Sequence, residues 1–410
     1  MDERDTVEVR PAWLFVATLA GLSMLGPFAI DAILPAFTDL GTHFGVAQGA
    51  LQQTLSVYLL AYAAMSLVHG PLSDALGRKP VMATGMALFV VSSVAAGFAS
   101  SLTMVLVWRA LQGVAAGAGQ IVSRAQVRDV FTGHRAQRTM AQVSMVFALG
   151  PALAPIIGGL LVVAGSWRGV LWFQAAYGLV MFALIVLWMP ETHPVAARTP
   201  LDLRTLVTGM GTVVRSPVGR RLTLIPALAF GGQFVLISGA SLFVVNLLGK
   251  GATDFWMLFV PLIGGGLVGS WVSARFAGRV PGRRLASIAY VISLAATTAL
   301  VLFSLVPATS VLPWIVLPIP AFTFGLSVAF PILTIALLDL FPHSRGGAAS
   351  VQSFVSLVLQ AAIAGLLVPI VGRTLPTLMA TTWAFMLVAF GLWVWHRRSA
   401  GNPPAVSHQP

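Results

Sequence analysis

Residues 140–164 read MAQVSMVFALGPALAPIIGGLLVVA, and none of their side chains is charged. The run exceeds the about 20 residues that an α-helix needs to cross the hydrocarbon core of a bilayer. Backbone N–H and C=O groups find no water there, so a run of this length is expected to be a helix rather than a barrel strand. The stretch therefore predicts a transmembrane helix.

The whole chain has the same character. Of its 410 residues, 57% are hydrophobic and 9% are charged, whereas an ordinary soluble protein has about 25% charged residues. This composition excludes a soluble enzyme, a nucleic-acid-binding domain and a disordered protein. The net charge of +12 is interpreted as a signal of orientation rather than of nucleic-acid binding, because the basic residues lie between apolar runs. There is no cysteine, hence no disulfide, thiolate nucleophile or cysteine metal site.

Twelve apolar runs of about 20 residues predict an all-α integral membrane protein with twelve transmembrane helices. The opening residues carry mixed charge and precede a run long enough to span, which argues against a cleaved signal peptide. The runs lie near 13–37, 51–69, 81–99, 102–122, 140–164, 170–189, 222–248, 256–276, 285–306, 312–338, 348–371 and 375–395.

The basic residues between the runs predict the orientation. With the N-terminus in the cytoplasm, 20 Lys and Arg residues fall on the cytoplasmic side. Only Arg168, Lys250 and Arg373 fall on the opposite side, and Arg109 lies inside a run. Because cytoplasmic loops of membrane proteins are enriched in Lys and Arg, we expect both termini in the cytoplasm.

The longest gap between runs divides the chain into six spans and six. It contains four prolines and five arginines but no apolar run, so we expect a cytoplasmic linker with room for a short surface helix. Two six-helix halves predict a binding site at the interface between them. The expected segments are a cytoplasmic tail 1–12, an N-terminal half 13–189, the linker 190–221, a C-terminal half 222–397 and a disordered tail 398–410.

Two charged residues are expected at membrane depth. Asp31 is the one acid well inside a run, and Arg109 is the one base. A charge in the membrane is costly and by default marks a functional site, although a structural ion pair is the alternative. At 1.5 Å rise per residue their depths differ by roughly 5 Å, so they could pair or share one water-filled cavity. A nearby guanidinium favours the ionised carboxylate, whereas desolvation favours the protonated acid. A carboxylate subject to both effects suits proton coupling.

Polar and aromatic side chains in the first, second and fourth runs are candidates for a substrate cavity. Tyr58, Tyr62, Met65 and His69 recur at spacings of four, three and four, which places them on one helical face. Pro27 has no N–H to donate to the carbonyl of Ser23, so a kink is expected there. Packing of helices would use the same residue types, and that alternative stays open. The expected cavity residues are Ser23, Tyr58, Tyr62, Met65, Gln112 and Gln120.

Residues 70–80, GPLSDALGRKP, are expected to form a loop after the second span. Gly70 permits close approach of helices, Gly77 permits a tight turn, and Asp74 can hydrogen-bond or face a helix N-terminus. The spacing resembles the signature loop of the major facilitator superfamily, in which an aspartate lies four residues after a glycine and precedes a second glycine and a basic pair. The resemblance implies a gating loop of Gly70, Asp74, Gly77, Arg78 and Lys79.

Three further strings resemble motifs of this superfamily. Residues 109–113, RALQG, resemble its arginine motif, which the family ties to proton transfer. Residues 31–35, DAILP, resemble a run of the bicyclomycin and chloramphenicol resistance (Bcr/CflA) branch, with Ala32 and Ile33 replacing Met-Tyr. Residues 150–159, GPALAPIIGG, resemble the motif of drug–proton antiporters, with Ala154 where Gly is usual. The antiporter motif thus carries over to Gly150, Pro151, Pro155, Gly158 and Gly159.

The resemblance implies a proton-coupled inner-membrane antiporter that exports lipophilic drugs, such as phenicols or bicyclomycin-like compounds, by alternating access. A metabolite or sugar exporter of the same fold is the alternative, but a sugar site needs many fixed polar groups and the chain has only two Asn. An intramembrane enzyme is the remote alternative, since paired intramembrane acids and a Gly-x-Ser-x-Gly elbow are absent from the sequence. The absence of a Walker string points to a gradient as the energy source.

In this interpretation Asp31 and Arg109 couple transport to protons, and Asp74 with Arg78 latches the cytoplasmic side in the outward-open state. The expected partners are a small lipophilic substrate, protons and the lipid bilayer, with no nucleic acid, cofactor or metal. The protein is expected to be a monomer.

Overall fold

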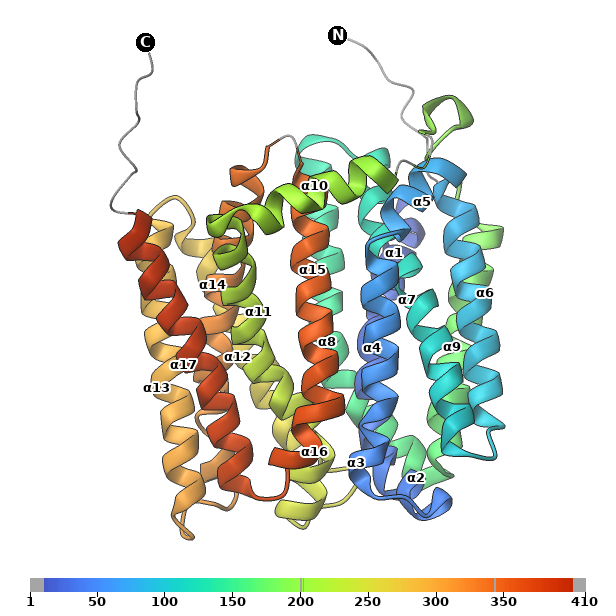
Figure 1. The fold of residues 1–410 in the computed structure, drawn as a ribbon. Helices are drawn as coiled ribbons and strands as arrows, with labels where there is room; N and C mark the ends of the chain where they lie inside the picture. Colours follow the sequence, from blue (N-terminus) through green and yellow to red (C-terminus); the bar gives the residue numbers. More distant parts are fainter. Residues whose placement is uncertain (1–10, 200, 202, 343, 401–410) are drawn as a thin grey trace. The chain divides into compact units, whose positions relative to one another are not determined.

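The computed structural model describes residues 11–199, 201, 203–342 and 344–400, and within them it contains helices and connecting segments but no strand (Figure 1). Among the described residues, eleven helices are long and apolar enough to cross a membrane. The pair Gln48–Ser66 and His69–Leu76, bent by 49°, makes a twelfth span. The predicted all-α membrane fold is confirmed.

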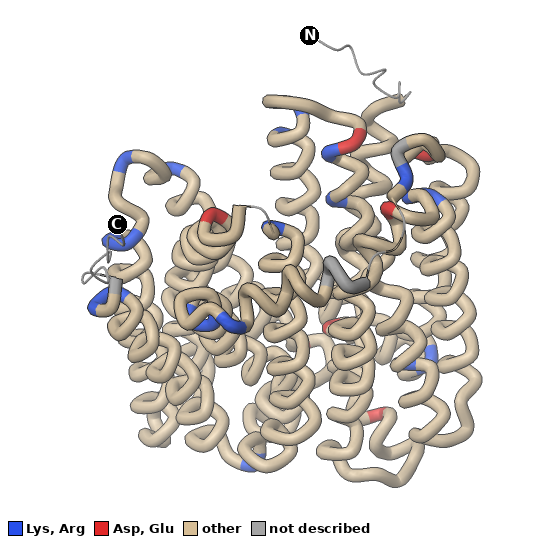
Figure 2. The backbone as a smooth tube through the Cα atoms, turned by 45° about the horizontal axis from the view of Figure 1, so that its top comes forward, with Lys and Arg blue, Asp and Glu red and all other residues tan. Residues whose placement is uncertain are grey.

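The chain forms two compact units. The first comprises Met1–Leu203, Ile237–Val260 and Gln360–Gly372, and the second comprises Arg204–Leu236, Pro261–Leu359 and Arg373–Pro410. Two short segments that follow the linker thus belong to the first unit. In both units Lys and Arg gather near the ends of helices, with long uncharged stretches between them (Figure 2).

The first unit is built from six long helices that stand side by side, with α5 at one end and α2 and α3 at the other (Figure 1). Its elements are α1 (Ala12–Asp31), η1 (Leu34–Ala36), α2 (Phe37–Phe44), α3 (Gln48–Leu51), α4 (Gln53–Ser66), α5 (His69–Leu76), α6 (Arg78–Gly97), α7 (Leu102–Val130), α8 (Gly133–Ala164), α9 (Trp167–Leu187), η2 (Val195–Ala197), the π-helices η3 (Leu242–Leu247) and η5 (Ile363–Leu367), and α16 (Val368–Val371).

The second unit contains α11 (Pro217–Ser238), α12 (Trp256–Phe276), α13 (Gly282–Leu305), η4 (Trp314–Val316), α14 (Ile319–Leu340), α15 (Arg345–Ala362) and α17 (Leu375–Ala400), with the ends of α11, α12 and α15 in the first unit. It also contains α10 (Leu203–Arg215), which lies within the predicted linker. Val213 of α10 joins an apolar cluster with Leu222, Leu337, Ala348 and Val351. The linker therefore carries a helix that packs on this unit, and α11 begins inside it at Pro217.

Small residues bring the helices of the first unit into close contact. A Cβ atom at Gly113 of α7 would collide with the backbone carbonyl of Tyr58 in α4, and one at Gly117 would lie 2.6 Å from the ring of His69. A Cβ at Gly85 of α6 would collide with Ala118 of α7. Without a hydrophobic force between helices in lipid, such close backbone approach supplies much of the packing.

The antiporter-like motif packs α8 against α1. A Cβ at Gly150 would lie 2.8 Å from Pro27, and one at Gly158 would collide with the carbonyl of Ala32. Gly159 lies equally close to the backbone of Ala252, in a segment of the same unit. Pro151 and Pro155 lie inside α8. The small residues of this motif thus permit close packing of α8 against α1.

The first span differs from its prediction. We expected Asp31 well inside a continuous helix over 13–37, but α1 ends at Asp31 and the chain continues through η1 into α2. Pro35 explains the break, since it lacks the N–H that would bond to the carbonyl of Asp31 in a continuing helix. Asp31 nevertheless stays within the apolar segment Ala12–Phe44.

The predicted loop 70–80 is also largely helical. Residues 69–76 form α5, Gly77 connects with φ +103°, and Arg78 begins α6. Proline is tolerated in the first turn of a helix, where its missing N–H has no partner to lose, so Pro71 does not prevent α5. The positive φ at Gly77 ends the helix, so the turn is a single residue.

The predicted tails fall largely outside the described residues, which begin at 11 and end at 400. Residues 398–400 differ from the prediction of disorder because α17 continues to Ala400. Arg397 and Arg398 lie in its last turn, where positive charge complements the helix dipole.

Candidate functional site

Arg109 of α7 is fully buried and has no acidic partner in the described residues. Its Nε donates to the carbonyl of Thr54 at 3.1 Å, and one terminal nitrogen donates to Oε1 of Gln112 at 2.8 Å. The guanidinium carbon lies 4.6 Å from the centre of the Tyr58 ring. The other terminal nitrogen is buried without a partner in the described chain. The charge is thus held by dipoles and an aromatic face from α4 and α7.

A relay of amide side chains connects Arg109 to the first helix. Gln112 donates to Oγ of Ser93 at 2.7 Å and to Oε1 of Gln174 at 3.3 Å. Gln174 of α9 donates to the carbonyl of Phe28 at 3.0 Å, three residues before Asp31. Gln174 was missed in the sequence; the signal that could have found it is an amide inside the apolar run 170–189.

Asp31 is 4% exposed and forms no hydrogen bond or ion pair with any residue that the structure describes. It therefore does not pair with Arg109, which answers a question that the sequence left open. The Tyr58 hydroxyl is buried and has no hydrogen-bond partner in the described chain. Tyr58 thus contacts the Arg109 guanidinium through its ring while its hydroxyl is left without a partner among the described residues.

The other predicted cavity residues form separate contacts. Tyr62 donates a short hydrogen bond to Oε1 of Gln120, which links α4 to α7. Ser23 donates to the carbonyl of Ala20 at 2.6 Å and lies 3.5 Å from that of Val143. Met65 is half-buried. The tyrosines and glutamines come together around α4 and α7, while Ser23 faces α8. Their role in a cavity stays a prediction.

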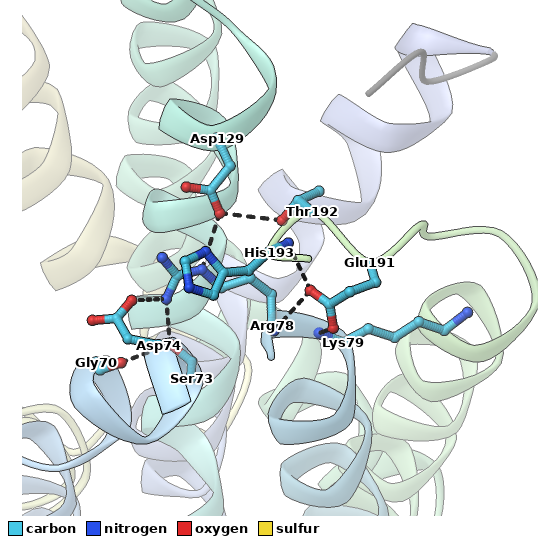
Figure 3. A network of polar contacts seen from close by, with 9 residues as sticks. All are labelled: Gly70, Ser73, Asp74, Arg78, Lys79, Asp129, Glu191, Thr192 and His193. Carbon is cyan, nitrogen blue, oxygen red and sulfur yellow. Dashed lines mark hydrogen bonds and ion pairs between the residues drawn. The ribbon is translucent and has the colours of Figure 1, made fainter. Parts of the chain in front are cut away.

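The residues of the signature stretch meet in a polar network at the α5 end of the first unit (Figure 3). Arg78 forms an ion pair with Asp74, and its Nε donates to Oδ2 of Asp129 at 3.0 Å. It also donates to Oγ of Ser73 at 2.7 Å. Thr192 donates to the same Asp129 oxygen at 3.2 Å. One guanidinium thus connects α5 and α6 to the end of α7 and to the segment after α9.

Glu191 caps the N-terminus of α6 in the same network. Its carboxylate accepts from the backbone N–H groups of Arg78 at 3.0 Å and Lys79 at 3.2 Å. A Cβ atom at Gly77 would lie 2.5 Å from a Glu191 oxygen. The side chain of Lys79 leaves the network and donates to the carbonyl of Val186 at 3.0 Å. A carboxylate at this position complements the helix dipole and satisfies two free donors.

Two features of the network differ from the sequence analysis. Asp129 and Glu191 are not among the residues predicted for the gating loop, yet both bind Arg78. Gly70 was expected to permit close helix approach, but a Cβ there would meet no atom of the described chain within 4 Å. Gly70 instead contributes its carbonyl, which accepts from Ser73 at 2.8 Å.

At the opposite end of the first unit, three glutamines donate hydrogen bonds from α3, from the start of α4 and from the residue between these helices. Gln52, fully buried, donates to the carbonyl of Ser238 at 2.8 Å, and Gln53 donates to that of Gly365 in η5 at 2.8 Å. Gln48, which is half-buried, donates to Oδ1 of the exposed Asn246 in η3 at 2.9 Å. The glutamines thus bind α3 and α4 to two segments that come from far along the chain. No group of side chains suited to binding a metal ion occurs in the described residues.

Comparison with known proteins identifies relatives over most of the chain. The family model of the Major Facilitator Superfamily matches residues 19–369. Multidrug resistance protein D of Escherichia coli (strain K12) is 31% identical over 332 residues, which cover 80% of this chain and 81% of that protein. A bicyclomycin resistance protein homolog of Haemophilus influenzae is 27% identical and covers 72% of this chain and 74% of that protein.

Among solved structures, the crystal structure of a D-xylose–proton symporter superposes with a TM-score of 0.73 at 15% identity. The match covers 93% of this chain and 96% of the symporter chain. At this identity the likeness concerns the fold alone.

Proposed function

Because the chain belongs to the Major Facilitator Superfamily, and is thus a membrane transporter and not an enzyme, we propose that it exports lipophilic drugs in exchange for protons. The relatives named for multidrug and bicyclomycin resistance support drug efflux. The scarcity of polar groups in the spans also favours lipophilic cargo over a sugar, because each unpaired sugar hydroxyl would weaken binding. Phenicols and bicyclomycin-like compounds are the first substrates to test.

The observation that carries the proposal is the state of Asp31. Its carboxylate is buried, lies at the end of α1, and has no cation partner in the described chain. A carboxylate in a salt bridge loses an ion pair when it takes up a proton. Asp31 has no such ion pair in the described chain, so protonation does not carry that cost. Burial penalises the charged form, and contact with water favours it. We therefore assign the carried proton to Asp31.

Arg109 is proposed to tune this proton step through Tyr58 rather than by direct contact. Its guanidinium covers the Tyr58 ring, and its relay through Gln112 and Gln174 ends on the backbone of α1 beside Asp31. A movement of α1 that changes the access of water to Asp31 would be transmitted along this relay. Tyr58, Tyr62, Met65, Gln112, Gln120 and Ser23 are proposed to line the substrate cavity.

Alternating access is proposed as the mechanism, with the two ends of the first unit serving as gates. The Arg78 network of the signature stretch is the cytoplasmic latch of the outward-open state. The glutamines of α3 and α4 close the other end. Each proton that moves down a membrane potential supplies about 2.3 kcal/mol per 100 mV, enough for roughly fiftyfold drug accumulation.

The protein is a multi-pass membrane protein. We propose that it lies in the bacterial inner membrane as a monomer with both termini in the cytoplasm. The 20 to 3 distribution of basic residues supports this orientation.

The decisive experiment compares Asp31→Asn with the wild type in inverted membrane vesicles that hold an acid interior. Addition of a phenicol or of bicyclomycin should release protons from wild-type vesicles, and Asp31→Asn should abolish this release while the protein stays inserted. Host cells that lack other efflux systems should lose drug resistance with the same substitution.

Asp39→Asn is the matched control. Asp39 accepts a hydrogen bond from the N–H of Trp167 at 2.7 Å, and an asparagine oxygen can accept the same bond, so exchange should persist. Unchanged exchange in Asp31→Asn would remove Asp31 from the mechanism. Exchange driven by sodium instead of protons would overturn the coupling.

A further inference from the structure

The second unit carries nearly all of the net charge of the protein. It contains twelve arginines, no lysine and a single acid, Asp339, an excess of eleven within a net charge of +12. The first unit has twelve basic and eleven acidic residues. Asp339 lies 3.5 Å from Arg345. Hence the second unit has no further acidic side chain that could pair with its other eleven arginines.

Three of these arginines lie where α11 and α13 begin and α17 ends. A terminal nitrogen of Arg397 in α17 donates to Oγ of Ser287 in α13 at 2.9 Å, and the indole of Trp393 donates to the same hydroxyl at 3.1 Å. The guanidinium of Arg221 in α11 lies 4.8 Å from the ring centre of Trp395. The partners of Arg397 and Arg221 are thus neutral: a serine hydroxyl that a tryptophan also binds, and a tryptophan ring.

His396 lies among these residues. Its ring stacks on Trp393 at 5.8 Å with an angle of 23° between the planes. Arg283 lies one turn before Ser287 in α13, and its backbone carbonyl accepts a hydrogen bond from the Ser287 hydroxyl at 2.7 Å. Its Nδ1 atom is buried and has no hydrogen-bond partner in the described residues. We call Arg221, Arg283 and Arg397 the arginine cluster. No acidic residue faces it from α11, α13 or α17, because these helices contain none.

The helix dipoles add to the positive potential. Arg283 and Arg284 are the second and third residues of α13, and Arg221 is the fifth residue of α11. Helix N-termini carry partial positive charge and favour anions, so arginines at these positions are unfavourable unless an anion is present. The cluster therefore combines side-chain and backbone charge of one sign.

We propose that the arginine cluster binds the phosphate headgroup of an anionic phospholipid. Guanidinium groups bind phosphate through paired hydrogen bonds, and basic pockets between transmembrane helices recognise anionic headgroups. The surroundings favour a lipid as the source of the phosphate. Trp395 is 55% exposed near the end of a membrane-spanning helix, where tryptophan rings typically meet headgroups.

Enrichment of arginine in cytoplasmic loops alone would not bring Arg397 and Trp393 to one hydroxyl or place Arg221 against the ring of Trp395. The first unit shows the contrast, because there Arg78 is bound by Asp74 and Asp129. An anion from outside the chain supplies what Asp74 and Asp129 supply in the first unit.

The test measures thermal stability and lipid retention of the purified full-length protein in neutral detergent. The probes are phosphatidylglycerol, phosphatidylcholine with the same acyl chains, and inorganic phosphate. Phosphatidylglycerol should raise the melting temperature more than phosphatidylcholine and should stay bound in native mass spectra. Each arginine removed from the cluster should weaken this retention by about fivefold.

The variant Arg221→Gln/Arg283→Gln/Arg397→Gln is compared with Arg128→Gln/Arg135→Gln/Arg138→Gln, which removes three exposed charges from the first unit. Phosphatidylglycerol should lose its effect on the cluster variant and keep it on the control. The single variants Arg283→Gln and Arg397→Gln, at exposed positions, are measured in parallel so that poor folding of the triple variant does not decide the outcome.

Equal loss in the control variant would overturn the proposal, because it would indicate a response to total charge. Equal stabilisation by inorganic phosphate would overturn the lipid as the source. Equal effects of phosphatidylglycerol and phosphatidylcholine would overturn recognition of an anionic headgroup.

Discussion

At the scale of single residues, Gly77 determines where two helices and an ion-pair network meet. Its φ of +103° is a conformation that residues with a Cβ rarely adopt, and that Cβ would lie 2.5 Å from Glu191. The carboxylate of Glu191 holds the first two N–H groups of α6. A side chain at position 77 would therefore both strain the turn and displace the Glu191 carboxylate that caps α6.

We expect Gly77→Ala to destabilise the protein by about 1–3 kcal/mol through backbone strain and to impair transport. A melting curve and a drug-efflux assay measure the two effects. Gly70→Ala is the control, since its Cβ meets nothing within 4 Å in the described chain and Ser73 needs only its carbonyl. If both variants behave alike, the role of Gly77 in the network is wrong.

At the scale of elements, α3 and α4 are held by hydrogen bonds from glutamine side chains to backbone carbonyls. Gln52 and Gln53 donate to carbonyls at Ser238 and Gly365, next to or within segments of π-helix. Ser56 packs against Gly365, where a Cβ would lie 2.5 Å from its hydroxyl. The contact is tight but rests on few polar bonds, which would allow the proposed gate to open.

The double variant Gln52→Ala/Gln53→Ala should shift the protein toward a state in which α4 separates from η5. Two hydrogen bonds of about 1 kcal/mol each correspond to roughly a thirtyfold change in population. A cysteine introduced as Ser56→Cys reports the opening, because the chain has no other cysteine. We expect faster labelling by a thiol reagent in purified protein.

Gln48→Ala serves as the comparison for this gate. Its bond to Asn246 is exposed and competes with water, so labelling of Ser56→Cys should change by less than about twofold. Labelling that is equally slow with and without Gln52 and Gln53 would show that their bonds do not hold the gate.

At the scale of the whole molecule, the distribution of basic residues predicts which side of the membrane each loop faces. Lys250 and Arg275 are both exposed, and Lys250 precedes α12 whereas Arg275 lies in its last turn. An impermeant thiol reagent should label Lys250→Cys in intact cells and label Arg275→Cys only after the membrane is permeabilised. The reverse pattern would invert the proposed topology and exchange the two gates.

The membrane fold and the positions of the main motifs could be predicted from the sequence, because both depend on local pattern. Hydropathy over about 20 residues reports a span wherever it packs, and the twelve runs recur as helices or as one bent pair. Local sequence pattern predicted less well where helices begin and end. The helical state of residues 69–76 and the end of α1 at Asp31 depend on single positions, Gly77 and Pro35.

The sequence by itself determined that this protein is embedded in lipid, how many times it crosses the membrane, and that Asp31 and Arg109 are the charged residues within its apolar runs. Only the tertiary structure decided which groups these charges meet. Arg78 binds Asp129 and Glu191, 51 and 113 positions away, whereas Arg109 bonds with a carbonyl and an amide instead of Asp31. The physical reason is that the burial of a side chain follows from the composition of the run around it. The pairing of side chains depends on how the helices are rotated and how closely they approach, and contacts between small residues far apart in the sequence determine both.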